Sequence, residues 1–199
     1  MLFRFSLYGF LKNQRYFEPF LILALLEKGL SFFAIGILIA FREIATNVLE
    51  IPSGSMADLL GRRRAMQVSF AAYLGSFLMF WQATEQRWLW PAMLLFAIGD
   101  AFRTGTHKAM IFAWLQAEGR SNDKTQVYGY TRSWSKLGSA TSVVIGAALL
   151  FWLDSYAAVF LLSAVPVALN LINLSSYPSY LDGELRTGNR LRDVWQHSR

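Results

Sequence analysis

Long stretches without any charged residue limit what this chain can fold into. Residues 65–84 carry no charge, nor do residues 137–153 or 155–181. A helix that crosses a membrane needs about 20 mainly apolar residues, and a core helix of a soluble protein rarely stays uncharged for so long. The chain is 16% charged, against about 25% in soluble domains. The sequence therefore predicts an all-α membrane protein embedded in a lipid bilayer.

Composition also excludes several function classes. The net charge of +6 could indicate a nucleic-acid binder, but basic residues also collect on the cytoplasmic side of membrane proteins, and we favour that explanation. The chain contains no cysteine, so it has no disulfide framework and no thiol-ligated metal site. It shows no nucleophile–base arrangement, phosphate-binding loop or metal-ligand cluster. We therefore expect neither an enzyme nor a protein that holds a cofactor or metal.

Four transmembrane helices follow from the apolar runs, at residues 65–84, 88–115, 127–153 and 155–176. The segment before residue 65 allows one helix or two, and the basic residues favour two, at 12–28 and 33–53. The dense cluster Arg62–Arg64 should be cytoplasmic, and two preceding helices place the basic N-terminus, with Arg4, Lys12 and Arg15, on the same side. We predict six transmembrane helices over residues 1–176, both termini in the cytoplasm, and a polar tail over 177–199 that begins a central linker.

Some charged residues fall inside the predicted helices. A charge at the bilayer centre costs at least about 2.5–3.5 kcal/mol, so such residues normally face a protein interior or a water-filled cavity. They occur only in helices one, two, four and five, which should surround a polar cavity, while helices three and six face lipid. The candidates for a substrate or proton pathway are Glu18, Arg42, Glu43, Asp100, Arg103, His107, Arg132 and Lys136.

The spacing of these residues along the sequence indicates which of them share a helix face. Asp100, Arg103 and His107 should form one stripe along helix four. The intramembrane set holds five cations and His107 against four acids, and a cationic cavity favours an anionic solute, with Arg103 and Lys136 as its deepest ligands. Glu43, near mid-depth, is the candidate proton carrier. The alternative is a set of structural ion pairs, such as Glu50 with Arg132.

The connection between helices two and three carries the most specific motif. It reads Gly-Ser-Met-Ala-Asp-Leu-Leu-Gly-Arg-Arg-Arg from Gly54 to Arg64. This order of glycine, acid, glycine and basic residues resembles the signature loop of the major facilitator superfamily. Gly54 and Gly61 permit close backbone approach and a sharp reversal. The resemblance implies that Asp58, Arg62 and Arg63 brace the cytoplasmic side of the transporter in its outward-open state.

Residues 49–54 and 99–107 also resemble bacterial members of this superfamily. The resemblance implies the N-terminal six-helix bundle of the major facilitator fold, in a bacterial inner (plasma) membrane. Members have twelve helices in two halves with the substrate site between them, so a C-terminal six-helix half is an expected partner. Ala113 stands where relatives often carry an acid that faces the signature loop, so that ion pair is not expected here.

Two functions fit these observations. The first is secondary active transport of a small solute, with an anionic substrate and proton coupling as hypotheses. The second is a truncated or half-length membrane protein without transport activity of its own, which acts as an assembly partner or is an inactive fragment.

Overall fold

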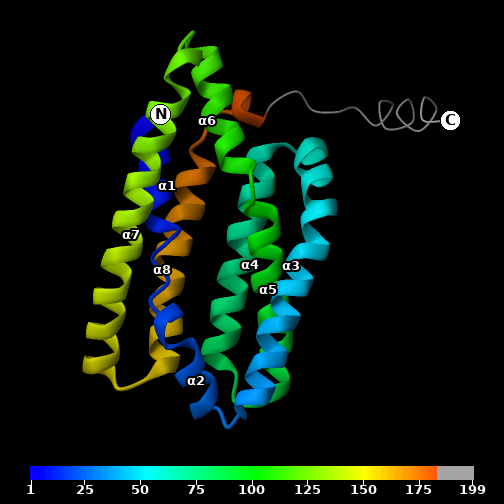
Figure 1. Ribbon diagram of the computed structural model, residues 1–199, viewed down its shortest axis with the longest axis vertical. Helices are drawn as coiled ribbons and strands as arrows, with labels where there is room; N and C mark the ends of the chain where they lie inside the picture. The colour runs from blue at the N-terminus through cyan, green and yellow to red at the C-terminus, as the bar shows by residue number, and fades with distance from the viewer. Residues whose placement is uncertain (183–199) are drawn as a thin grey trace, which may run out of the picture.

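The computed structural model describes residues 1–182, apart from the side chain of Asp58, and every regular element in that range is helical (Figure 1). The tail predicted beyond residue 182 lies outside the described residues. The α-helices are α1 (Leu2–Leu11), α2 (Leu21–Glu27), α3 (Phe32–Leu60), α4 (Arg62–Gln82), α5 (Leu89–Arg103), α6 (Thr106–Ala117), α7 (Lys124–Leu153) and α8 (Tyr156–Ser175). Short 3₁₀ helices are η1 (Glu18–Phe20), η2 (Gln86–Trp88), η3 (Ser121–Asp123) and η4 (Ser179–Asp182).

Length and hydropathy support a membrane protein. Three helical segments are long and apolar enough to cross a bilayer: Phe32–Ala57, Ser121–Leu153 and Tyr156–Ser175. The other passes are shorter or more polar helices. α4 carries glutamine, serine and tyrosine side chains among its apolar residues, and the first and fourth passes are broken.

The first pass through the bundle is broken, although the sequence predicts one helix over 12–28. α1 ends at Leu11 and α2 begins at Leu21. Pro19 lacks a backbone donor and disfavours helix at the residue before it. The amide side chains of Asn13 and Gln14 donate instead to α7, to the carbonyls of Ser135 (2.6 Å) and Gly138 (3.0 Å). The pass therefore starts ten residues earlier than predicted, and its polar centre lies inside the bundle.

The fourth pass is broken too, where the sequence predicts a continuous helix over 88–115. α5 ends at Arg103 and α6 begins at Thr106. Gly105 lies between them in the left-handed region, with φ of 73°, which a residue with a side chain adopts only at a cost. The predicted stripe of Asp100, Arg103 and His107 is consequently divided between two helices.

The second pass extends beyond its predicted end at residue 53. α3 continues through Pro52 to Leu60, because the residues that follow Gly54 include good helix formers (methionine, alanine and leucine). Gly61, with φ of 94°, makes the reversal alone and also precedes the first residue of α4. The signature loop is therefore mostly the last turns of α3.

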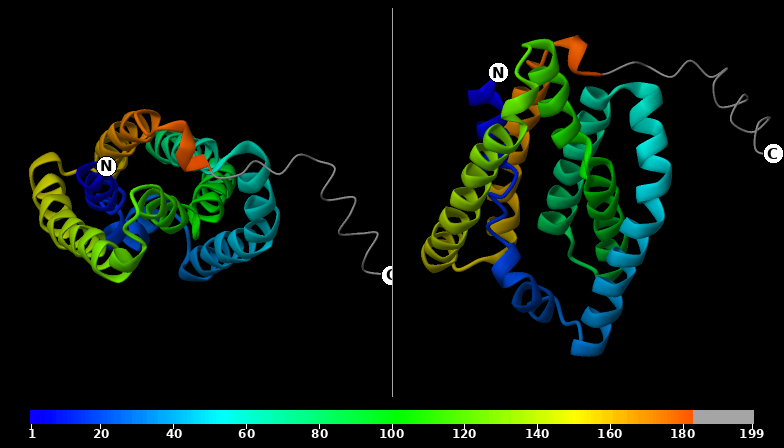
Figure 2. Two further views of the ribbon diagram at one scale, coloured as in Figure 1. Left: turned by 90° about the horizontal axis from the view of Figure 1, so that it is seen from above. Right: turned by 45° about the horizontal axis from the view of Figure 1, so that its top comes forward.

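The helices form an elongated bundle. The N-terminus, the α3–α4 turn, the α6–α7 connection and η4 gather at one end, and the α2–α3, α4–α5 and α7–α8 connections lie at the opposite end (Figure 1). α4 packs against α5 and α8, α3 packs on α5, and α1 packs on α7. Viewed from above, α7 and α3 stand at opposite ends of the outline (Figure 2).

The expectation that helices three and six face lipid stays a prediction, because packing within this chain shows only which faces its own helices cover. α4 and α8 pack against each other, and half of the apolar window of α8 is buried (50%), against 11% in α3 and 17% in α7. A lack of charge shows that a helix tolerates lipid, but it does not say how many neighbours the helix has. Within this chain, α3 and α7 are the helices with the most uncovered apolar surface.

The connections at the end opposite the N-terminus are tied together. Lys28 Nζ donates to the carbonyl of Ala83 at 2.6 Å, and Gln86 Nε2 donates to the carbonyl of Gly29 at 3.0 Å. Burial lowers the pKa of the Lys28 ammonium group, and the neighbouring Glu27 carboxylate opposes this shift. Two hydrogen bonds therefore hold the α2–α3 and α4–α5 connections together.

Candidate functional site

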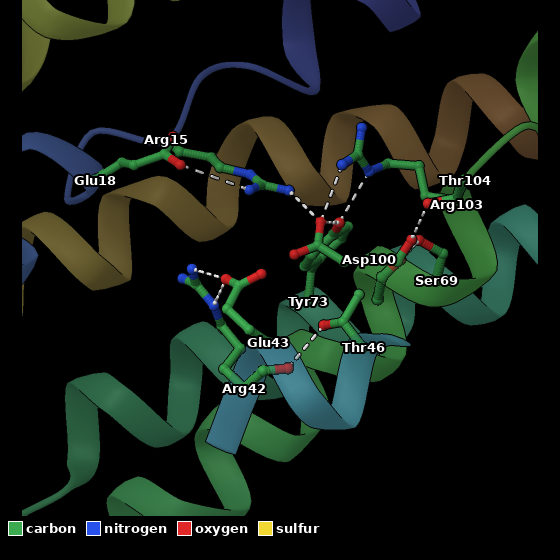
Figure 3. Close-up of polar contacts among 11 residues, drawn as sticks. Arg15, Glu18, Arg42, Glu43, Thr46, Ser69, Tyr73, Asp100, Arg103 and Thr104 are labelled. Atoms are coloured by element: carbon green, nitrogen blue, oxygen red, sulfur yellow. Dashed lines mark hydrogen bonds and ion pairs between the residues drawn. The ribbon is translucent and has the colours of Figure 1, made fainter. Parts of the chain in front are cut away.

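A cluster of charged side chains lies where the two broken passes meet. The Asp100 carboxylate, at the end of α5, accepts hydrogen bonds from Arg103 (2.9 Å) and from Arg15 (3.4 Å), which comes from the unwound part of the first pass. Tyr73 on α4 donates its hydroxyl to the same carboxylate and accepts a bond from Arg103 Nε at 2.9 Å. Figure 3 shows both guanidinium groups directed at Asp100. Three separate passes thus contribute to one ionic cluster.

The cluster is packed on aromatic rings. The Arg15 guanidinium lies 4.8 Å from the centre of the Tyr73 ring and 4.9 Å from that of Phe96. Only 13% of the Arg15 side chain and 21% of the Asp100 side chain are exposed. Removing a partner from such a pair leaves an uncompensated buried charge, which costs several kcal/mol. These contacts therefore hold the two breaks in fixed positions relative to each other.

A glycine on α5 makes this contact with α4 feasible. A Cβ atom added at Gly99 would come within 2.7 Å of the Tyr73 ring. On the same helix pair, Ser69 donates its hydroxyl to the carbonyl of Gly99 at 2.6 Å. The absence of a side chain at Gly99 lets the Tyr73 hydroxyl reach Asp100.

The charged pair on α3 lies beside this cluster. Arg42 and Glu43 bond to each other, and the Arg42 guanidinium lies 5.2 Å from the centre of the Phe96 ring. The Glu43 side chain is 57% exposed. Glu18 is also exposed and reaches Arg15 at 3.9 Å. The predicted pair of Glu50 with Arg132 does not occur among the ion pairs of residues 1–182.

His107 belongs to α6 and does not join the ionic cluster. Its ring stacks on Tyr8 of α1 with ring centres 3.7 Å apart, and Phe5 meets it edge-on. Its Nε2 atom is buried and has no hydrogen-bond partner within the described part of the chain. Gly105 thus interrupts the predicted stripe between Arg103 and His107, although both residues line a small cavity together with Lys12 and Tyr128.

Arg132 and Lys136 line a cavity between α1, α6 and α7. The cavity has a volume of about 260 Å³, and its lining includes Lys12, His107, Tyr128 and Ser135. Two predicted pathway residues, Arg132 and Lys136, thus share a cavity with Lys12, for which the charge pattern predicts a cytoplasmic position. Arg103 is not among the residues that line it.

At the end of the bundle that holds the N-terminus, the signature loop contacts the segment after α8. Asp182 accepts a hydrogen bond from the backbone N–H of Arg63 at 2.8 Å, and its other oxygen lies 3.7 Å from Arg63 Nε. Arg63 also donates to the carbonyl of Tyr177 at 2.9 Å. Asp182 thereby satisfies a free amide at the start of α4, where a negative charge is favoured.

Several sequence expectations for this loop change. Gly61 makes the predicted sharp reversal, and a Cβ atom there would come within 2.9 Å of Asp182. Gly54 lies inside α3 with nothing within 4 Å of such an atom, so no close approach depends on it. Arg62 is half-buried at the start of α4. The Asp58 side chain lies outside the described part of the structure.

Sequence reasoning missed two residues of the ionic cluster. The charge pattern predicts a cytoplasmic position for Arg15, and Tyr73 lies in a part of α4 without charged residues that would single it out. The signal for Arg15 was present, since the apolar stretch of residues 2–11 and that of residues 21–26 flank a polar centre. No sequence signal marks Tyr73, whose role depends on which helix packs against Gly99.

Helices of membrane-spanning length, two breaks within the bundle and a buried ionic cluster define a helical membrane protein with a polar interior. Residues 8–187 match the family model of the Major Facilitator Superfamily. The chain therefore belongs to that superfamily and is a transporter of the major facilitator kind. A comparison with proteins of curated function finds no match.

Proposed function

We propose that the chain crosses the membrane six times and forms the N-terminal half of a secondary active transporter for a small solute. In this arrangement α1 with α2 forms one broken pass, and α5 with α6 forms another. The observation that carries the proposal is the meeting of both breaks at the cluster of Arg15, Tyr73, Asp100 and Arg103. Irregular backbone at membrane depth is tolerated only within protein or beside a cavity, and in transporters such breaks lie next to the substrate site.

The orientation follows from the basic residues. The end of the bundle that holds the N-terminus also carries Arg62–Arg64, Arg120 and Lys124. Positive charge in short loops favours the cytoplasmic side. Both termini then lie in the cytoplasm, and the membrane is the bacterial inner membrane that the superfamily resemblance implies.

The cavity favours an anionic solute. Lys12, Arg132 and Lys136 line it, and no acid is among the described residues of its lining. The pairing of Glu43 with Arg42 favours a structural role for Glu43 over proton transfer. Dependence of uptake on a proton gradient is therefore part of the test below, and Glu43→Gln is expected to leave that dependence unchanged.

Exposed apolar side chains on α3 and α7 indicate that another set of helices packs against these two helices. Ile51 is 81% exposed, Val144 69% and Phe151 84%. We propose that a second set of six helices, on the same or another chain, covers these faces and completes the substrate site. The same observation favours the second function, in which the chain assembles with another membrane protein without transporting a solute itself.

Uptake by proteoliposomes tests the proposal. The purified chain should be reconstituted alone and with any polytopic protein that co-purifies with it, and supplied with radiolabelled methyl phosphate or succinate, with and without an inward proton gradient. We expect saturable uptake in at least one preparation and none in protein-free vesicles. A folded chain that gives no flux of any solute in either preparation supports the second function.

A further inference from the structure

Three acidic side chains beside the ionic cluster, Asp100, Glu18 and Glu43, are already paired with arginines, whereas Glu50 of α3 has no ion-pair partner among the described side chains. Asp100 lies 2.9 Å from Arg103 and 3.4 Å from Arg15, Glu18 lies 3.9 Å from Arg15, and Glu43 contacts Arg42. The cluster at the two breaks thus holds two arginines against two carboxylates. Arg103, the predicted anion ligand, already pairs with the Asp100 carboxylate and donates its Nε hydrogen to the Tyr73 hydroxyl.

The cations that line the cavity lack such compensation. Lys12 comes from the end of α1, and Arg132 and Lys136 come from α7. Within residues 1–182, none of the three has a carboxylate oxygen within 4.0 Å. Arg132 and Lys136 are one helical turn apart, a spacing at which like charges destabilise a helix. The cavity therefore collects positive charge that the described part of the chain does not neutralise.

The size and remaining lining of the cavity limit what could neutralise it. A volume of about 260 Å³ lies just below the range of about 300–1,000 Å³ that is common for ligand pockets. The hydroxyl of Ser135 and the ring of Tyr128 also line it, and so does His107, whose Nε2 has no partner within the described residues. A small solute with several oxygen atoms suits this combination of charge, hydrogen-bonding groups and volume.

We propose that the cavity between α1, α6 and α7 binds a compact solute with at least two negative charges, as a phosphate ester or a dicarboxylate has, through Lys12, Arg132 and Lys136. This inference rests on the proposed transport of an anionic solute and deepens it. A solute with one negative charge would leave two of the three cations uncompensated. The ionic cluster around Asp100 then positions the two broken passes and does not bind the solute.

Calorimetric titration of the purified full chain in detergent tests the inference. The probes are methyl phosphate and succinate at a pH where both are dianions, with acetate as a monoanion and glycerol as a neutral solute. We expect methyl phosphate or succinate to bind, acetate to bind about tenfold or more weakly, and glycerol to give no binding signal. Whichever dianion binds more tightly assigns the class of solute.

Variants locate the site. Arg132→Gln and Lys136→Gln should each weaken dianion binding about tenfold or more, because each removes a charged hydrogen-bonding partner. Arg132→Lys keeps the charge and should retain most of the affinity. Arg87→Gln removes an exposed cation at the other end of the bundle and should bind like the unmodified chain. The unfolding midpoint of each variant identifies any loss of binding that follows from loss of structure.

Failure of this inference is distinguishable from failure of the proposed function. Dianion binding that survives Arg132→Gln and Lys136→Gln but is lost in a folded Arg103→Gln variant overturns the cavity site and leaves anion transport in place. If neither dianion binds the unmodified chain, the inference is wrong, while uptake of another solute by proteoliposomes would still support transport.

Discussion

At the scale of single residues, the interior depends on one shared carboxylate. Asp100 accepts from Arg15, Arg103 and Tyr73, which belong to three different passes. In a low-dielectric environment each such bond is strong, and a buried donor or acceptor left without a partner lowers the stability of the fold correspondingly. Tyr73 is the uncharged member, so its hydroxyl can be removed without changing the charge of the cluster.

We expect Tyr73→Phe to lower the stability of the chain by about 1–3 kcal/mol, because Asp100 and Arg103 each lose a hydrogen-bond partner. The measurement is the thermal unfolding midpoint in detergent, followed by tryptophan fluorescence. Tyr180→Phe is the matched control, since Tyr180 is 50% exposed. Equal midpoints for the two variants would show that the Tyr73 hydroxyl contributes nothing measurable.

At the scale of the elements, helix packing in this bundle relies on small residues. A Cβ atom added at Gly138 or Gly146 of α7 would overlap the carbonyl of Phe10 or Tyr16, and one at Gly9 would come within 2.8 Å of Thr131 O. Small residues let helix backbones approach closely in membranes. This close approach also places the amide side chains of Asn13 and Gln14 within reach of α7 carbonyls, and so helps to hold the first break.

Gly138→Ala should destabilise the contact between α1 and α7, because the added methyl group would overlap the Phe10 carbonyl and the backbone would have to move. We expect a loss of about 1–3 kcal/mol, as for other overpacked interiors. Gly129→Ala, on the same helix with open space around the new atom, should be neutral or slightly stabilising. The comparison requires unfolding curves of both variants, and a loss in Gly129→Ala as large as that in Gly138→Ala would contradict the packing argument.

At the scale of the whole molecule, the arrangement of the two ends predicts a membrane topology. Ser121 lies in η3, at the end that holds Arg62–Arg64, and Glu85 lies at the opposite end. The chain has no cysteine, so single cysteines introduced at these two positions can be labelled selectively.

In intact cells, an impermeant maleimide should label Glu85→Cys and leave Ser121→Cys unlabelled, because the basic end faces the cytoplasm. Both positions should react after the membrane is permeabilised. Labelling of Ser121→Cys alone in intact cells would invert the proposed orientation, and labelling of both would contradict the separation of the two ends by the membrane.

The sequence by itself determined the class of protein, the resemblance to a superfamily and most of the charged residues in the interior. These features depend on local composition, since a long uncharged run can satisfy its backbone in lipid only as a helix. The reversal at Gly61 was also predictable, because it needs a conformation that glycine adopts without cost.

Only the tertiary structure decided which charges are compensated. Arg15 and Asp100 are 85 positions apart in the chain, and they meet because the first pass unwinds where α7 and α8 can bond its polar groups, as when Tyr16 N donates to Ser163 Oγ at 3.1 Å. The break at Gly105 likewise places His107 in a different helix from Asp100 and Arg103. Electrostatic compensation depends on distances between separate passes, and those distances are set by packing that periodicity within one helix does not encode.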